Sequence, residues 1–351
     1  YHAAHCGQWE QEQCSHCPID AAGKIETPRR VIYGVKENIY SMLNVTLICT
    51  SEWQYKQVSR SMLKNQEAKI IPPPVDTGIF YSGPKAAARS VLGLPQEAKI
   101  ILFHHEGGIT HSLSGGNYLL PALRELAQHD PEVIFVQIGT QDVSVFNGLN
   151  LPRRDLLNQS NRAIIAEYYR AADLYLHPSP LDSHYTSVLE AAACGTPAVV
   201  FDVGSVREFV SHEKTGYVVS PLHPTAFLQG IKTCLANHSR LTALGQAAAL
   251  NAKQKYSHKK IISQYTALYR ELAQVSLPVP QDKSIQDTDF LPQIPVIVAT
   301  ALADGWDTVW QEFDKYLSQY GSEQKSQQAI FTDAYFHECL RHLQADQDKN
   351  K

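Results

Sequence analysis

The sequence predicts an α/β protein built on a doubly wound parallel sheet, and two observations support this fold class. Short apolar runs of strand length alternate with segments of helical period along residues 45–255. In addition, residues 174–201 form a unit of strand, loop, helix and strand, whose helix is stopped by Gly195 and Pro197. Parallel neighbouring strands need such a helical crossover, so the alternation favours a parallel sheet.

The predicted elements follow in chain order. Residues 45–50 and 69–71 are predicted strands around a helix at 52–64. The apolar run at 99–104 predicts a buried strand. The later elements are helix 117–129, strand 133–138, helix 163–172, strands 174–177 and 198–201, and helices 225–237, 240–255 and 257–272. After a proline-punctuated linker at 278–295, residues 296–320 and 324–343 are predicted to form a helical extension.

Composition indicates a globular enzyme rather than a nucleic-acid or membrane-spanning protein. The chain has 351 residues, 44% of them hydrophobic, and a net charge of −4. This length suggests two domains, and the charge gives no basic surface for nucleic acid. Because no apolar run approaches the roughly 20 residues of a membrane span and no signal peptide is recognisable, we expect a cytoplasmic protein.

The stretch from His177 to Pro197 holds the first candidate site. It places Asp182 on a loop and Glu190 eight positions later on the following helix. In an open parallel sheet this loop lies at the carboxyl ends of the strands, where ligands bind, and the helix start offers N–H groups to an anion. The alternative is purely structural: Asp182 or Ser183 as an N-cap, with Ser187 and Glu190 as a capping box.

A glycine-rich loop after the strand at 99–104 is the second candidate site. Gly107, Gly108 and Gly115, with Ser114, would let the backbone approach a phosphate closely. A plain connection between strand and helix is the alternative. Nearby histidines are candidate phosphate donors or ordinary surface and packing residues; they are His104, His105, His111 and His184.

Cysteines gather in the first twenty residues. Cys6, Cys14 and Cys17 lie among three histidines, and this pattern is compatible with a zinc site, a disulfide or unpaired thiols. The second cysteine pair typical of zinc ribbons is missing, so we predict no catalytic metal. The other cysteines are expected to be core or free thiols: Cys49, Cys194, Cys234 and Cys339.

The stretch around Asp182 and Glu190 resembles the E-x7-E signature of the retaining group 1 (family 4) glycosyltransferases, here in the form D-x7-E. Further similar pieces occur in the family's order over residues 45–272. They are Ile71 to Asp76 with Phe80, Ala171-Ala172-Asp173, Asp202 to Gly204 with Glu208, and Lys214 to Tyr217. Cys14 to Pro18 is also similar to a segment found in a subset of these enzymes.

The resemblance implies the two-domain GT-B fold and transfer of a sugar from a nucleotide-sugar donor, with retained configuration and without a cofactor or obligatory metal. Glu190 would bind the donor ribose, and Asp182 would contact the sugar or stabilise charge on its ring. The backbone of Tyr185, Thr186 and Ser187 would bind the leaving diphosphate. The acceptor would be a carbohydrate or a glycan or lipid-linked molecule, which leaves peripheral membrane contact possible.

Two departures from the family pattern concern the same site. Leu113 and Ser114 stand where the family usually has an Arg and a Lys for the donor diphosphate. His184 and Tyr185 stand where it has an aromatic residue and a glycine. These departures favour the alternative function, a degenerate donor domain that acts as a binding or interaction module.

The resemblance also implies a domain plan. Residues 1–80 would be a remnant of the acceptor domain with the Cys-rich segment, and 81–256 the Rossmann-like donor-binding domain. Residues 257–274 would form the crossover helix, and 275–351 the linker and helical extension. Because only residues 1–80 precede the donor half and the chain begins at Tyr1 without a Met, we expect a fragment that lacks most of the acceptor domain.

Overall fold

A computed structural model of the chain describes residues 29–42, 45–111, 113–139, 144–180 and 185–274. The chain divides into two compact units, Tyr1–Val275 and Ser276–Lys351, of which the second lies outside the described residues. The predicted extension at 296–320 and 324–343 and the segment with Cys6, Cys14 and Cys17 therefore lie outside them as well. Within the described residues, no helix has both the length and the apolar character needed to cross a bilayer.

The first described elements are a helix and a small parallel unit. Helix α2 spans Arg29–Met42. Strands β1 (Thr46–Cys49) and β2 (Glu67–Ile70) pair directly in parallel, and α3 (Glu52–Val58) lies between them in the sequence. Helix α3 is shorter than the predicted helix 52–64. The Ser61 hydroxyl donates to the Val58 carbonyl at 2.9 Å and accepts from the Leu63 N–H at 3.1 Å, so a turn replaces the next helical turn.

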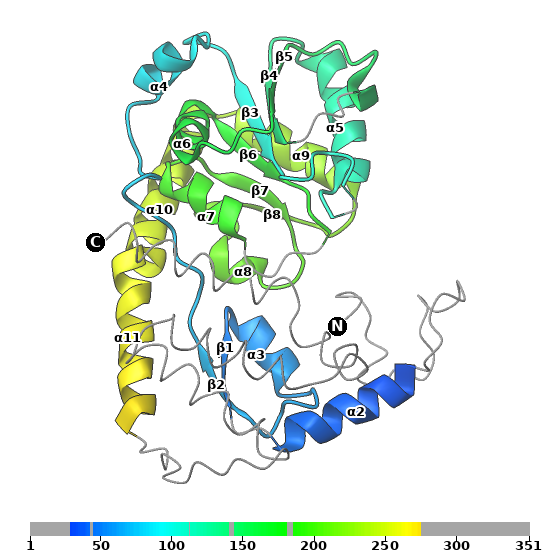
Figure 1. The fold of residues 1–351 in the computed structure, drawn as a ribbon. Helices are drawn as coiled ribbons and strands as arrows, with labels where there is room; N and C mark the ends of the chain where they lie inside the picture. The colour runs from blue at the N-terminus through cyan, green and yellow to red at the C-terminus, as the bar shows by residue number, and fades with distance from the viewer. Residues whose placement is uncertain (1–28, 43–44, 112, 140–143, 181–184, 275–351) are drawn as a thin grey trace, which may run out of the picture. The chain divides into compact units, whose positions relative to one another are not determined.

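A six-stranded, entirely parallel sheet forms the main domain (Figure 1). Its order is β5-β4-β3-β6-β7-β8, so the chain moves outward from β3 in one direction and then outward from β6 in the other. This reversal confirms the predicted doubly wound sheet. The strands are β3 (Ile100–His104), β4 (Ile134–Gly139), β5 (Arg153–Leu157), β6 (Leu174–His177), β7 (Ala198–Phe201) and β8 (Gly216–Val219).

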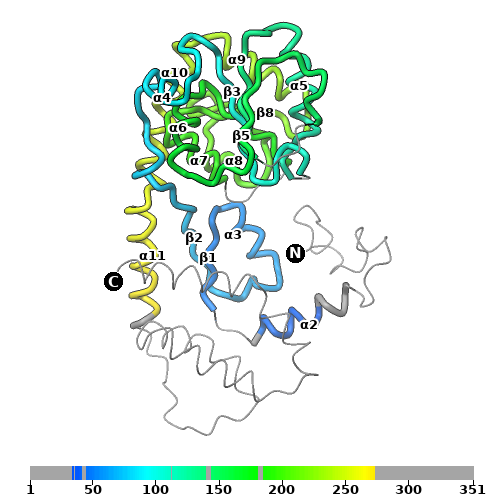
Figure 2. Tube along the Cα trace, turned by 45° about the horizontal axis from the view of Figure 1, so that its top comes forward, coloured from blue at the N-terminus to red at the C-terminus, as the bar shows by residue number. Residues whose placement is uncertain are grey.

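Helices cover both faces of this sheet (Figure 2). They are α4 (Lys85–Leu92), α5 (Gly116–His129), α6 (Arg162–Ala171), α7 (Thr186–Ala193), α8 (Val206–Phe209), α9 (Pro224–Leu235), α10 (His238–Tyr256) and α11 (His258–Gln274), with a 3-10 turn η2 at Ser144–Phe146. Strand β3 shows why both faces are apolar. Ile100 and Leu102 join the core cluster of α6 and α7, whereas Ile101 and Phe103 join that of α5 and α9.

Strand β4 carries a buried amide without a hydrogen-bond partner among the described residues. The Gln137 side chain is fully buried, and neither its Nε2 nor its Oε1 is bonded. It lies between Phe103 of β3 and Asp155 of β5 in the strand register. Burying an unbonded polar group costs about 1–3 kcal/mol.

Gln137→Met should therefore stabilise the protein, because methionine keeps the length of the side chain and removes the unsatisfied amide. We expect the melting temperature to rise by about 2 °C or more. Thermal unfolding checks this, with Gln137→Glu as the control, which should lower the melting temperature because it adds a buried charge. A lower melting temperature for the methionine variant would show that the amide has a partner.

Candidate functional site

A cleft of about 650 Å³ opens at the carboxyl ends of the parallel strands. We call it the carboxyl-edge cleft. It is lined by residues at or just after the carboxyl ends of β3, β4, β5 and β6 and by the N-terminal parts of α6 and α7, including His104, Glu106, Gly139, Asn158, Arg162, His177, Thr186, Ser187 and Glu190. Because β3 and β6 flank the point where the strand order reverses, the cleft lies where open α/β sheets bind ligands.

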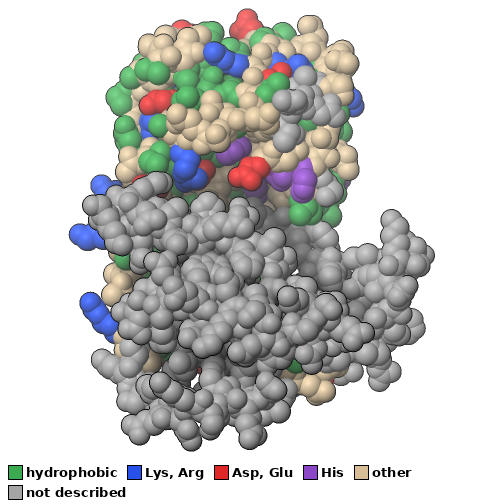
Figure 3. Space-filling model, in the orientation of Figure 1, with side chains coloured by type: hydrophobic (Ala, Val, Ile, Leu, Met, Phe, Trp, Pro, Cys, Tyr) green, Lys and Arg blue, Asp and Glu red, His purple; other side chains and the backbone are tan. Residues whose placement is uncertain are grey.

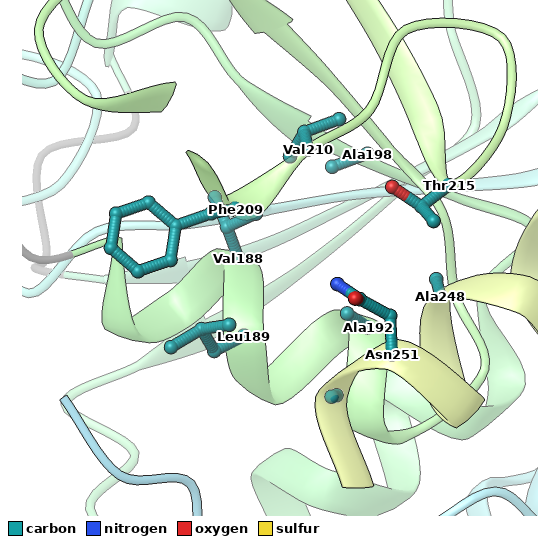
Figure 4. A pocket seen from close by; sticks show the side chains of 10 residues that line it. Val188, Leu189, Ala192, Ala198, Phe209, Val210, Thr215, Ala248 and Asn251 are labelled. Carbon is teal, nitrogen blue, oxygen red and sulfur yellow. The ribbon is translucent and has the colours of Figure 1, made fainter. Parts of the chain in front are cut away.

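A second cavity is too small to hold a substrate. It has a volume of about 10 Å³ and lies between α7, β7 and α10 (Figure 4). Apolar side chains such as Val188 and Phe209 line most of it, and Thr215 and Asn251 bring the polar groups. This is at most the room of one water molecule. The carboxyl-edge cleft is therefore the candidate site.

Glu190 is the buried acid of the cleft. Only 4% of the residue is exposed, and its Oε1 accepts a hydrogen bond from Arg162 Nη2 at 2.9 Å. Burial raises the pKa of Glu190 to about 7; Arg162 opposes the rise, and the negative charge of Glu106 adds to it. Glu190 is thus partly protonated near neutral pH.

The structural alternative, in which Ser187 and Glu190 form a capping box, is not seen among the described residues; its N-cap candidates Asp182 and Ser183 lie outside them. Helix α7 begins after Tyr185, its N-cap, and no side chain of the described residues caps its first turn. The carboxylate of Glu190 bonds Arg162 rather than the helix start, so Ser187 and Glu190 form no capping box. Thr186, Ser187 and Glu190 line the cleft together.

Arg162 is a site residue that the sequence analysis missed. It starts α6, where Asn161 is the N-cap and accepts from the N–H groups of Ala163 and Ile164. Its guanidinium lies 4.9 Å from the centre of the Phe80 ring, and half of its side chain, 53%, is exposed. A basic residue in the first turn of a helix is unfavourable next to the helix dipole. This unfavourable position was the signal by which Arg162 could have been found in the sequence.

Tyr185 adopts the left-handed backbone conformation that glycine takes most easily, with φ 48° and ψ 33°. Its side chain points away from the cleft into the core, where its ring lies 5.6 Å from His177 and 5.4 Å from Phe209. The hydroxyl donates to the Val203 carbonyl at 2.7 Å. The turn before α7 is therefore held by a buried aromatic anchor rather than by glycine's freedom.

Tyr185→Phe should lower the free energy of unfolding by about 1–2 kcal/mol, because the partly buried Val203 carbonyl loses its hydrogen-bond donor while the ring contacts remain. Thermal unfolding checks this. Tyr217→Phe is the control: its hydroxyl donates to the exposed Glu213 carboxylate, which water can solvate instead. Equal losses in the two variants would contradict the role of the Val203 bond.

The glycine-rich loop is placed by packing. A Cβ at Gly115, where φ is 79°, would lie 1.9 Å from the Pro178 carbonyl oxygen, so only glycine lets this loop approach the segment after β6. Ser114 is buried, and its hydroxyl donates to the Ile109 carbonyl at 2.6 Å. Gly107, Gly108, Ser114 and Gly115 are not among the residues that line the cleft, whereas the neighbouring Glu106 is.

Histidines form part of the cleft wall. Burial lowers the pKa of His104 to about 4, so its ring is neutral at pH 7, and its Nδ1 lies 2.9 Å from the Tyr169 hydroxyl. His105 and His111 face each other with ring centres 4.8 Å apart. In the space-filling view, histidine, acidic and basic side chains gather at one edge of the domain (Figure 3).

Several residues of the sequence predictions cannot be placed in the site. Asp182 and His184 lie outside the described residues, as do Cys6, Cys14 and Cys17. In the part of the chain that the structure describes, no cluster of His, Cys, Asp or Glu suits a metal ion. Cys49, Cys194 and Cys234 are buried free thiols, as expected for core cysteines.

Comparisons with known proteins find relatives of this domain. The family described as "Glycosyl transferases group 1" matches residues 99–237. A protein of Segniliparus rotundus named D-inositol 3-phosphate glycosyltransferase is 32% identical over 202 residues, which are 53% of this chain and 43% of that protein. This chain thus spans about half the length of the curated relatives it matches.

Solved structures share the fold. Sucrose-phosphate synthase from Thermosynechococcus elongatus superposes with a TM-score of 0.61 at 24% identity, covering 70% of this chain and 62% of that one. Anabaena HepE, solved in complex with UDP-glucose, superposes with a TM-score of 0.56 at 20% identity, covering 68% of this chain and 67% of that one. At these identities the likeness establishes the GT-B type fold.

Proposed function

Because residues 99–237 match the group 1 glycosyltransferase family, we propose that the carboxyl-edge cleft of this chain binds a nucleotide sugar and that the protein transfers the sugar. The observation that carries this proposal is the position of Glu190. This buried carboxylate lies in a cleft at the switch point of the sheet, beside the start of α7. That arrangement suits a molecule with a diol and a diphosphate.

In this proposal each group of the cleft recognises one part of the donor. The carboxylate of Glu190 accepts hydrogen bonds from two ribose hydroxyls. The N–H groups at Thr186 and Ser187 face the diphosphate, whose negative charge the helix dipole favours. A uridine diphosphate sugar is the first candidate, because the structural neighbour from Anabaena was solved with UDP-glucose.

The chemical step that we propose retains the configuration of the sugar. The bond between the anomeric carbon and the diphosphate oxygen breaks, and its electron pair leaves with the nucleoside diphosphate. The acceptor hydroxyl oxygen bonds the same face of the anomeric carbon and loses its proton to the departing diphosphate. Asp182 would stabilise the positive charge on the sugar ring, and the N–H groups of α7 would stabilise the leaving diphosphate.

The acceptor that we propose is a carbohydrate or a lipid-linked glycan. The donor half needs no resident cofactor for this chemistry, since the diphosphate is itself the leaving group. The non-catalytic alternative is not favoured, because the matched family and the curated relatives are described as glycosyltransferases.

Calorimetric titration with uridine, guanosine and adenosine diphosphate sugars tests the proposal. We expect saturable binding of one nucleotide class, and release of free sugar or transfer to an added acceptor extract. The cleft residue Glu190 provides the control variant, Glu190→Ala, in which binding should be lost. A folded protein that binds none of these donors would overturn the proposal.

A further inference from the structure

Arg162 and Glu190 form the ion pair of the carboxyl-edge cleft. The two residues are 28 positions apart in sequence, and Arg162 Nη2 lies 2.9 Å from Glu190 Oε1. The other face of the guanidinium is occupied by the Phe80 ring, at 4.9 Å. Arg162 is the only Lys or Arg among the described residues that line the cleft. It is therefore held in place on two sides.

Other titratable groups lie around Glu190 in the cleft. From the loop after β3, Glu106 adds negative charge, and His104 is neutral. From α6, the buried Tyr169 hydroxyl faces the same region, and its pKa is raised well above its usual value by burial, with further contributions that include the charge of Glu190. His177, the last residue of β6, and His105, just after β3, also line the cleft. Arg162 is thus the described group that opposes protonation of Glu190.

We propose that Arg162 is a positioning residue of the donor site: its guanidinium keeps the Glu190 carboxylate ionised and oriented for the ribose diol. This inference rests on the proposed function. Arg162 acts through Glu190 and not by touching the donor. An ionised carboxylate accepts with both oxygens, whereas a protonated carboxyl group has one acceptor oxygen fewer for the diol.

The proposal has a consequence for the pH dependence of donor binding. Burial raises the pKa of Glu190 to about 7, so the carboxylate is lost as the pH falls below that value. Donor binding should therefore weaken toward acid, with a midpoint near neutral pH. Without Arg162 the protonated form is favoured further, so the midpoint should move to higher pH.

Titration of the full chain with UDP-glucose between about pH 6 and about pH 8.5 tests this, because neither its diphosphate diester nor its base changes charge over most of that range. Arg162→Met keeps an aliphatic chain on Phe80 and removes the charge. We expect binding about tenfold weaker at pH 7, with a pH midpoint raised by about half a unit or more. Arg162→Lys should restore part of the affinity and bring the pH midpoint part of the way back.

A second readout separates positioning from direct phosphate contact. The counterpart of UDP-glucose with 2′-deoxyribose lacks one of the hydroxyls that Glu190 would bind. If Arg162 acts through Glu190, Arg162→Met should lose most of its affinity for the ribose form and little for the deoxy form. If Arg162 binds the diphosphate instead, both forms should weaken equally, and the positioning role would be refuted.

Arg154→Met is the matched control. Arg154 also lies over a ring, that of Tyr168, and bonds the Leu92 carbonyl, but it is not among the residues lining the cleft. Its variant should keep the wild-type affinity and pH profile. An unshifted midpoint in Arg162→Met, with donor still bound, overturns the positioning role alone. Absence of binding to any sugar nucleotide by the wild-type chain overturns the proposed function and this inference with it.

Discussion

Glu190→Gln should reduce nucleotide-sugar affinity by about a hundredfold, because the amide keeps the shape of the side chain but loses charge-assisted bonds worth about 3 kcal/mol. The amide also offers one acceptor oxygen in place of two. Isothermal titration of the wild-type chain and the variant measures the effect. Ser187→Ala, a change at another cleft residue, should cost little because we assign binding there to the backbone.

Stability measurements distinguish this loss of affinity from unfolding of the variant. Since the pKa of Glu190 is raised to about 7 in the folded protein, the native state holds a proton that the unfolded state releases above about pH 4.5. The contribution of Glu190 to stability therefore falls as the pH rises from about 4.5 through about 7. Glu190→Gln should be more stable than the wild type at about pH 8 and no more stable at about pH 5.

Opposite results would contradict the donor site. If Glu190→Gln binds the donor as tightly as the wild type, the carboxylate does not recognise the ribose. If Ser187→Ala and Glu190→Gln lose equal stability at every pH with unchanged affinity, both residues serve only the structure of α7.

Asp173→Ala should destabilise the protein by about 3–5 kcal/mol, because it leaves a buried charge uncompensated. Asp173 lies just before β6 and is 6% exposed. Its carboxylate accepts from Arg89 Nη2 at 2.8 Å, from Lys85 Nζ at 2.6 Å and from the Ile100 N–H at 2.8 Å. Removing it leaves the buried Arg89 guanidinium and the first N–H of β3 without this partner. Urea unfolding gives the free energy.

Asp202→Ala is the matched control for Asp173→Ala. The Asp202 carboxylate also bonds an arginine, Arg207, through two nitrogens at 2.8 and 2.6 Å, but this pair is exposed. Exposed pairs contribute about 1 kcal/mol or less. Losses of the same size in both variants would show that burial of Asp173 does not set its contribution.

The success of the sequence predictions follows the position of each strand in the sheet. The predicted strands β3, β4, β6 and β7 lie inside the sheet, where helices cover both faces and the sequence becomes a continuous apolar run. The two strands that were not predicted, β5 and β8, are its two edges. Strand β5 begins Arg153-Arg154-Asp155 and is largely exposed, so it has no such run.

The sequence by itself determined the fold class, the interior strands of the sheet and the placement of Glu190 on a helix after a strand and loop. These are local properties, because hydrophobic periodicity and helix stops act within a few residues. Only the tertiary structure decided the partner of Glu190 and the conformation of Tyr185. Arg162 meets Glu190 because α6 and α7 converge on one edge of the sheet, and the Tyr185 hydroxyl is bonded to Val203, 18 positions away. Contacts of this kind exist only once the sheet has formed, so no local pattern specifies them.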